Sequence, residues 1–209
     1  LSFGLHLRWK KTAVNMLELK PGERVLDVCG GTADLAIMAA RAVGPSGSVT
    51  VYDINQAMME LGRRKARKAA IESRVHFVQG DAEQISLPDT YFDGAMVGFG
   101  IRNVTRMERG LAEIHRVLKP GGKFLCLEFS QPPPGVFRSL YDFYSFQVMP
   151  RIGRLFTGSS QAYLYLPESI RLFPSPEGLS EILKKIGFCN VTYRLLTKGI
   201  AAIHVGVKG

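Results

Sequence analysis

The stretch RVLDVCGGTAD, residues 24–34, decides the fold. Residues 24–29 form a short apolar run bounded by turn residues, which is typical of a buried strand. The turn that follows contains Gly30 and Gly31, whose missing Cβ atoms allow unusual dihedral angles. Residues 33–43 have the composition of a helix. The stretch therefore predicts a strand, a tight loop and a helix, which is the unit of a parallel α/β sheet.

The same alternation continues on both sides of this unit. Further helices are predicted at residues 5–19, 56–70 and 105–118, and further strands at 48–52, 75–79, 91–97 and 123–129. Strands that alternate with helices form right-handed crossovers, so the sheet should be parallel with helices on both faces.

The end of the chain follows another pattern. A helix at 179–186 precedes strands at 189–196 and 200–207, which only Thr197-Lys198-Gly199 separates, so they should pair antiparallel. Nine of the twenty aromatic residues fall between 137 and 173, inside an insert at 131–174. We interpret this insert as a lid, and residues 1–209 as a single domain whose mostly parallel, seven-stranded sheet ends in an antiparallel hairpin.

Composition excludes several classes of protein. Hydrophobic residues make up 46% of the chain, yet no apolar stretch reaches the roughly 20 residues that span a bilayer. The three cysteines and four histidines show no metal-ligand spacing, so no metal is expected.

The net charge of +9 favours an anionic partner, either nucleic acid, acidic lipid or an acidic substrate. The first residue is Leu1, so we expect a longer natural N-terminus.

The loop after the first predicted strand is the expected ligand site. In an open parallel sheet, ligands bind beyond the carboxyl ends of the strands. Asp53 ends the second strand, where a carboxylate can accept both hydrogen bonds of a ribose diol, and Gly80-Asp81-Ala82 ends the third, beside an adenine edge. Without these features the loop would be an ordinary strand–helix turn.

The residues of this loop distinguish between two nucleoside cofactors, NAD and S-adenosylmethionine. The dinucleotide pattern G-x-G-x-x-G is not present, and Asp27 and Asp34 would repel a pyrophosphate. The same carboxylates suit the ammonium and sulfonium groups of S-adenosylmethionine (SAM), so SAM is favoured over NAD. The expected cofactor-binding residues are Asp27, Gly30, Gly31, Thr32, Asp34, Asp53, Ile54, Met58, Gly80, Asp81, Ala82 and Gly98.

Several stretches resemble one family over nearly the whole chain, the ubiquinone/menaquinone biosynthesis C-methyltransferases. They are LSFGLH at 1–6 with Trp9, FGIRN at 99–103, RVLKPGGKFLCLEFS at 116–130, and YLYLPESI at 163–170. The resemblance implies the Rossmann-like fold of the class I SAM-dependent methyltransferases. The family loop usually reads GGTGD, whereas this chain has Ala33 at the fourth position. A helical backbone there would accommodate the added methyl group.

The resemblance implies methylation of a ring carbon on a prenylated demethylquinol. A methyl sulfonium needs a carbon nucleophile, which a quinone ring becomes only when it is reduced and loses a hydroxyl proton. The expected catalytic residues are Arg102, Asn103, His6 and Tyr163. Arg102 would stabilise a phenolate or position a water, and Asn103 would orient an oxygen or else cap a helix near Thr105. His6 has a suitable pKa for a base, and Tyr163 would line the quinol pocket.

A lipid-soluble substrate and a basic chain together predict peripheral contact with an anionic membrane surface. The expected location is the cytoplasmic side of the inner membrane, or a mitochondrial matrix or plastid, and a homodimer or a quinone-synthesis complex is a further expectation. Three alternatives stay open: another lipophilic acceptor such as a sterol, phenol or polyketide, a nucleic-acid methyltransferase, and a non-catalytic subunit. The nucleic-acid alternative is disfavoured because Gly98-Phe99-Gly100-Ile101 replaces the Pro-Pro motif of amino-methylating enzymes.

Overall fold

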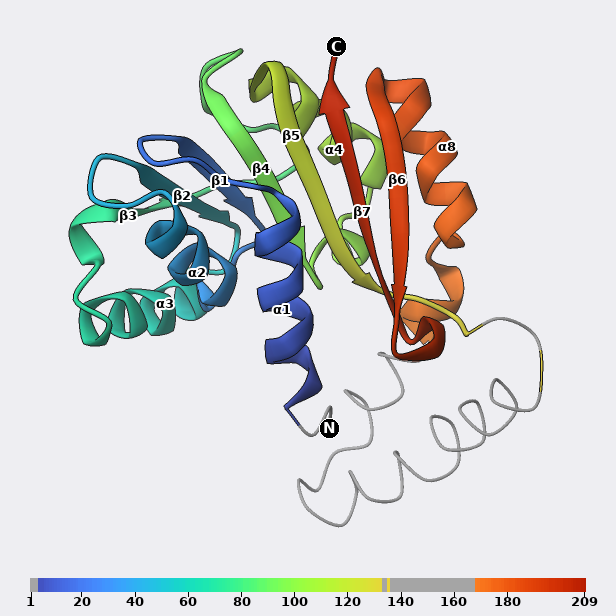
Figure 1. Cartoon of the computed structure of the whole chain (residues 1–209), viewed down its shortest axis with the longest axis horizontal. Coiled ribbons are helices and arrows are strands. Elements are labelled where there is room, and N and C mark those ends of the chain that lie inside the picture. Colours follow the sequence, from blue (N-terminus) through green and yellow to red (C-terminus); the bar gives the residue numbers. More distant parts are fainter. Residues whose placement is uncertain (1–3, 133–134, 136–167) are drawn as a thin grey trace.

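A seven-stranded sheet with strand order β3-β2-β1-β4-β5-β7-β6 forms the centre of the protein (Figure 1). The computed structural model describes residues 4–132, 135 and 168–209. The strands are β1 (Arg24–Val28), β2 (Ser48–Asp53), β3 (Val75–Gln79), β4 (Phe92–Gly98), β5 (Leu118–Phe129), β6 (Phe188–Leu196) and β7 (Ala201–Lys208). The first five strands are parallel, and β7 is antiparallel to both β5 and β6. The predicted sheet and its C-terminal hairpin are therefore confirmed.

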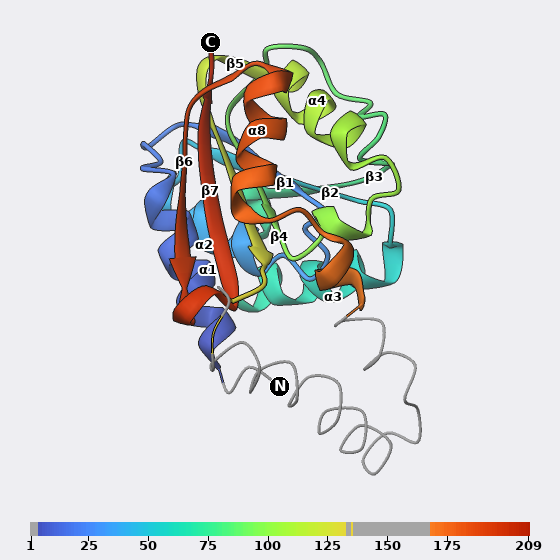
Figure 2. The same ribbon diagram turned by 90° about the vertical axis from the view of Figure 1, so that its right-hand side faces the viewer.

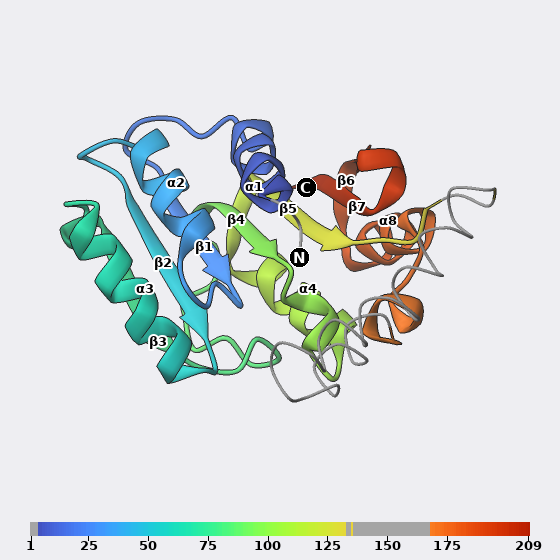
Figure 3. The same cartoon turned by 90° about the horizontal axis from the view of Figure 1, so that it is seen from below.

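Helices cover both faces of this sheet (Figures 2 and 3). On one side lie α1 (Leu5–Met16), α2 (Asp34–Ala42) and α3 (Gln56–Lys68), and on the other lie α4 (Met107–Val117) and α8 (Pro176–Ile186). The short 3-10 helices are η1 (Glu72–Arg74), η2 (Ile101–Asn103) and η4 (Thr197–Gly199). Two apolar clusters, one on each face, hold the layers together because the sheet buries side chains on both sides.

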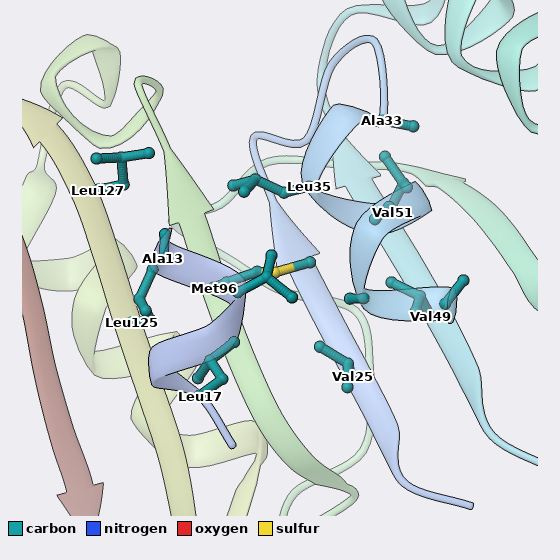
Figure 4. Packing of buried hydrophobic residues seen from close by; sticks show 14 of the residues in the cluster. Ala13, Leu17, Val25, Ala33, Leu35, Val49, Val51, Met96, Leu125 and Leu127 are labelled. Carbon is teal, nitrogen blue, oxygen red and sulfur yellow. The ribbon is translucent and has the colours of Figure 1, made fainter. Parts of the chain in front are cut away.

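Figure 4 shows the cluster beneath α1 and α2. Ala13 and Leu17 extend from the α1 segment onto Leu125 and Met96 of the central strands, and all four are essentially buried. Burying a leucine or methionine side chain contributes about 1.5–3 kcal/mol, and the Ala13 methyl group contributes less. This packing fixes α1 against β4 and β5, and β4 pairs with β1, whose carboxyl end carries the predicted ligand loop.

Several element boundaries differ from the sequence-based expectation. Helix α8 begins at Pro176 rather than at 179, because the Ser175 hydroxyl accepts a hydrogen bond from the Gly178 amide and proline suits the first helical position. Strand β5 begins at Leu118 rather than at 123, since Phe92 pairs with Leu118 across a register shift that absorbs the expected Lys-Pro-Gly-Gly turn. Most of the predicted lid, including all nine of its aromatic residues but Phe173, lies outside the described residues.

The expected helical backbone at Ala33 is wrong. Ala33 has φ 62° and ψ 25°, in the left-handed region, and α2 begins one residue later at Asp34. The left-handed conformation costs an L-residue roughly 1–2 kcal/mol. The methyl group packs beside Gly62 of α3, where an added Cβ would lie 3.1 Å from the Ala33 Cβ, and Ala33 does not line the cavity described below. The methyl group therefore does not crowd a ligand.

We predict that Gly62→Ala lowers the free energy of unfolding by about 1–3 kcal/mol. Its new Cβ would lie 2.8 Å from the Phe77 ring and 3.1 Å from both the Gly31 oxygen and the Ala33 methyl group. This crowding should outweigh the gain of about 1 kcal/mol in helix propensity. Urea denaturation measures the change. Gly178→Ala in α8 is the matched control, since its Cβ meets no atom closer than 3.5 Å, and it should stabilise the protein. A Gly62→Ala variant as stable as the control contradicts the prediction.

Candidate functional site

A cavity of about 500 Å³ opens at the carboxyl ends of β1, β2 and β4. The residues that line it include all twelve expected cofactor-binding residues and Asn103. Sequence reasoning missed several other lining residues, namely Lys10, Cys29, Leu35, Tyr52, Asn55, Glu83, Phe99, Gly100, Val104 and Thr105. The fold thus brings together residues that lie up to 95 positions apart in the sequence (Lys10 to Thr105). That the twelve residues bind SAM stays a prediction.

The floor of the cavity is the loop between β1 and α2, which the carboxylate of Asp53 holds from β2. Asp53 Oδ2 accepts a hydrogen bond from the Gly31 amide at 2.8 Å, and its Oδ1 accepts one from the Asn55 amide at 2.8 Å. Asn55 in turn caps α3 by accepting from the Met58 amide. Asp53 therefore ties the glycine loop to the start of α3, in addition to any contact with a ligand.

Asp27 is the buried acid of the site. It lies at 1% exposure in β1, and its Oδ2 accepts a hydrogen bond from the Ala36 amide in the first turn of α2. Its Oδ1 is buried without a hydrogen-bond partner among the described residues. Burial raises the pKa of Asp27 from 3.8 to about 7, and the Ala36 amide and Lys10 only partly oppose this. At neutral pH the carboxyl group is poised to ionise when a cation approaches.

Glycine is required directly above this acid. A Cβ at Gly30 would lie 2.8 Å from the Asp27 carboxyl group and 2.9 Å from Val51. The backbone at Gly30 therefore approaches the acid more closely than any other residue allows. The combination of an open glycine cradle and an orphaned buried carboxylate oxygen fits a ligand that carries an ammonium or sulfonium group, as SAM does.

The β4 side of the cavity is aromatic. Phe99 lines the cavity, its ring centroid lies 4.6 Å from that of Phe129, and Trp9 lies 6.3 Å from each of them. The Trp9 indole nitrogen donates to Thr197 Oγ1 at 3.0 Å, which fixes α1 against η4. We call Trp9, Phe99 and Phe129 the aromatic wall. An apolar ring could stack beside it, next to the carboxylate-lined part of the cavity.

The predicted catalytic residues occupy different positions. Asn103 lines the cavity and does not cap α4, which begins at Met107 with Arg106 as its N-cap residue. Arg102 and His6 are not among the lining residues, although Arg102 is adjacent to them in η2 and His6 lies in α1. Tyr163 lies outside the described residues.

Arg102 is engaged by two partners. Its Nη1 donates to Glu128 Oε1 at 2.6 Å and to the Phe99 carbonyl oxygen at 2.7 Å, and its guanidinium carbon lies 5.3 Å from the Phe129 ring centroid. Burial raises the pKa of Glu128, and Arg102 opposes that rise. The Nε of Arg102 is buried without a partner among the described residues. Arg102 therefore lies against Phe129 of the aromatic wall, and its Nε–H is left without a partner among the described residues.

The described residues hold no group of three or more His, Cys, Asp or Glu side chains arranged to bind a metal. Cys29 lines the cavity, but burial raises the pKa of its thiol to about 12, so it is not a nucleophile at neutral pH. The described part of the chain therefore offers a cradle for a charged organic ligand.

We predict that Asp27→Asn stabilises the ligand-free protein increasingly as the pH rises. A pKa raised from 3.8 to about 7 means that the folded state favours the neutral acid, so stability is lost between pH 4 and pH 7 as the unfolded chain ionises first. The full difference is at most about 4 kcal/mol. Asparagine keeps the bond to the Ala36 amide and does not titrate.

Chemical denaturation of both proteins between pH 5 and pH 8 measures this difference. The advantage of the variant should grow up to about pH 7 and then level off. Because all other titrating groups are shared, they cancel in the comparison. A difference that does not change with pH would show that Asp27 keeps its ordinary pKa.

Comparison with known proteins identifies the family. The model of the ubiE/COQ5 methyltransferase family matches residues 1–208. The ubiquinone/menaquinone biosynthesis C-methyltransferase of Shewanella pealeana is 44% identical over 208 residues, which cover 100% of this chain and 83% of that protein.

Solved structures share the fold at lower identity. A SAM-dependent methyltransferase from Aquifex aeolicus has a TM-score of 0.70 at 20% identity, with 98% of this chain and 91% of that chain covered. The [4+2]-cyclase SpnF has a TM-score of 0.74 at 21% identity, with 97% and 81% covered. The expected class I fold, the methyltransferase class and SAM as cofactor are confirmed. The chain belongs to the ubiE/COQ5 methyltransferase family.

Proposed function

We propose that this protein methylates a ring carbon of a prenylated demethylquinol, in menaquinone or ubiquinone biosynthesis. The observation that carries the proposal is Phe99, which lines the carboxylate-rich cavity and is backed by Trp9 and Phe129, so that an apolar side chain lies beside the predicted cofactor site. The names of relatives at 44% identity support the same acceptor. When bound, SAM supplies an electrophilic methyl group on a positively charged sulfur.

The residues of the chain supply position and charge balance. Asp53 and Asp81 would hold the nucleoside part, and the glycine loop and Asp27 would hold the amino-acid part. Phe99 and its aromatic neighbours would keep water away from the acceptor and orient its ring. Asn103 lines the cavity and can donate to an acceptor oxygen.

Arg102 would act on the acceptor through its positive charge. A quinol hydroxyl that loses its proton becomes a phenolate, and a guanidinium beside it lowers the cost of that charge. Arginine is not the base itself, because a guanidinium group stays protonated in proteins. His6 and Tyr163 stay proposed as helpers in proton transfer or acceptor binding.

The proposed place of action is an anionic membrane surface, because the acceptor is lipid-soluble and the chain carries a net charge of +9. No helix within the described ranges is both long and apolar enough to cross a membrane. We propose the cytoplasmic side of the inner membrane, or a mitochondrial matrix or plastid surface in a eukaryote. A homodimer or a quinone-synthesis complex is a further proposal.

The proposal predicts that labelled methyl groups move from SAM only to reduced rings. Purified protein is incubated with methyl-labelled SAM and prenylated demethyl-benzoquinol or demethyl-naphthoquinol, and the product is separated and counted. The oxidised quinones are the controls, since they lack the nucleophilic carbon. Label in the oxidised ring contradicts the nucleophile argument. Transfer to a sterol or simple phenol instead would favour another lipophilic acceptor, and transfer to none would favour a non-catalytic subunit.

We predict that Arg102→Ala lowers the rate of turnover by a larger factor than it lowers SAM affinity. We also predict that Asp53→Ala weakens SAM binding at least about tenfold. Calorimetry measures the affinity and the label assay measures turnover. Breaking a buried ion pair costs about 3–5 kcal/mol of stability, so folding has to be separated from catalysis.

The double variant Arg102→Met/Glu128→Gln removes both charges and avoids an uncompensated Glu128. If Arg102 acts on the acceptor, this variant stays slow although it folds. Recovery of turnover in the double variant would show that Arg102 acts only through Glu128 and the fold.

A further inference from the structure

Lys10 is the one basic side chain among the described residues that line the cavity. Five acidic residues line the same cavity, Asp27, Asp34, Asp53, Asp81 and Glu83. These acids suit the ammonium and sulfonium groups of SAM, but they repel the carboxylate of its methionine part. A ligand with both signs of charge therefore needs a cation at one point of the cavity wall.

The structure places Lys10 at the correct end for that carboxylate. Lys10 enters from α1, its side chain is 15% exposed, and its Nζ lies 2.8 Å from Asp34 Oδ2 at the start of α2. Asp53 and Asp81, the predicted nucleoside partners, follow β2 and β3 instead. In the sheet, β2 and β3 both lie on the same side of β1. If the nucleoside of SAM lies over β2 and β3, its amino-acid part should lie over β1, which is the end of the cavity where Lys10 is.

Asp34 keeps Lys10 in this position. Its second oxygen, Oδ1, accepts from Lys65 Nζ of α3 at 2.6 Å, so one carboxylate joins α1, α2 and α3. Burial opposes the ionisation of Asp34, but the two lysines outweigh it and lower the pKa of its carboxyl group. A lysine held by an ionised partner is preorganised and loses little side-chain freedom when a ligand binds.

We infer that Lys10 binds the α-carboxylate of the methionine part of SAM. Asp34 holds the ammonium group of the Lys10 side chain at the cavity wall. Lys10 is thus a specificity residue for an amino-acid-bearing nucleoside. The inference rests on SAM as the cofactor and is independent of the methyl acceptor. The alternative is that Lys10 only tethers α1 to α2 through Asp34.

The test compares S-adenosylhomocysteine with its decarboxylated analogue by calorimetry. Wild-type protein should bind S-adenosylhomocysteine about tenfold more tightly or better, because a charge-assisted hydrogen bond is lost with the carboxylate. Lys10→Met should bind both ligands with affinities within about threefold of each other. Lys10→Arg should restore most of the preference, since it keeps the positive charge.

Two matched lysine variants control for charge and for the tether. Lys65→Met removes the other partner of Asp34, and Lys65 does not line the cavity. Lys11→Met removes the same charge from an exposed position of α1, next to Lys10 in the sequence. Both variants should keep the wild-type preference.

Two results overturn the inference. One is an equal loss of affinity for both ligands in Lys10→Met, which a tether alone would give, and the other is a preference that survives in that variant. If Lys10→Met does not fold, Lys10→Gln, which can still donate to Asp34, replaces it with the same criteria. No acceptor is present in these experiments, so their failure leaves the proposed acceptor untouched, and failure of the acceptor assay leaves Lys10 untouched.

Discussion

The site depends on a carboxylate that the fold buries next to other carboxylates. Asp27 accepts a bond from the first turn of α2 with one oxygen and leaves the other without a partner among the described residues. Burial makes the ionised form of Asp27 unfavourable. In the protein without ligand, a charged Asp27 therefore lacks a full set of hydrogen-bond or ionic partners at neutral pH. A cationic ligand that binds only the folded state removes this cost and stabilises the fold by linkage. Under the proposed role of Asp27 in cofactor binding, stability and cofactor binding would be coupled through this one side chain.

Some of the backbone strain in the protein lies around the same cavity. Cys29, Ala33 and Phe99 all have positive φ, between 53° and 62°, at the carboxyl ends of β1 and β4. Each of these conformations costs an L-residue roughly 1–2 kcal/mol, so the surrounding packing has to hold them. The close approach of Gly30 to Asp27 and of Gly62 to the loop shows how that packing is achieved. Two of the three strained residues, Cys29 and Phe99, line the cavity.

The sequence allowed much of this arrangement to be predicted, because periodicity and turn residues report local structure. The alternation of strands and helices led to the parallel sheet, and the positions of Gly30, Asp53 and Asp81 after consecutive strands led to one cavity. Contacts between distant segments left no such signal. Lys10 lies in a helix that precedes the loop, and its approach to Asp34 depends on how α1 packs. The pairing of Arg102 with Glu128 likewise depends on the neighbouring ends of β4 and β5.

The left-handed backbone conformation of Ala33 also could not be predicted from the sequence pattern. A residue just before a helix can adopt either a helical or a left-handed backbone, and here the loop above Asp27 and the contact with Gly62 decide it. The same competition between local preference and tertiary packing moved the starts of β5 and α8.

The fold does not determine the reaction, since SpnF, a [4+2]-cyclase, shares it with methyltransferases. On the β4 and β5 side of this chain, the buried Arg102–Glu128 pair lies against the Phe129 ring of the aromatic wall. The pair is neutral overall, so a phenolate beside it has to compete with Glu128 for the guanidinium group. Burial weakens Glu128 in that competition by raising its pKa. Since leaving a buried Glu128 without its cation is costly, the phenolate would share the guanidinium with Glu128 rather than replace it. In the proposed reaction, the acceptor end and the cofactor end would follow one rule: each would place a partly compensated charge near a ligand group of the opposite charge.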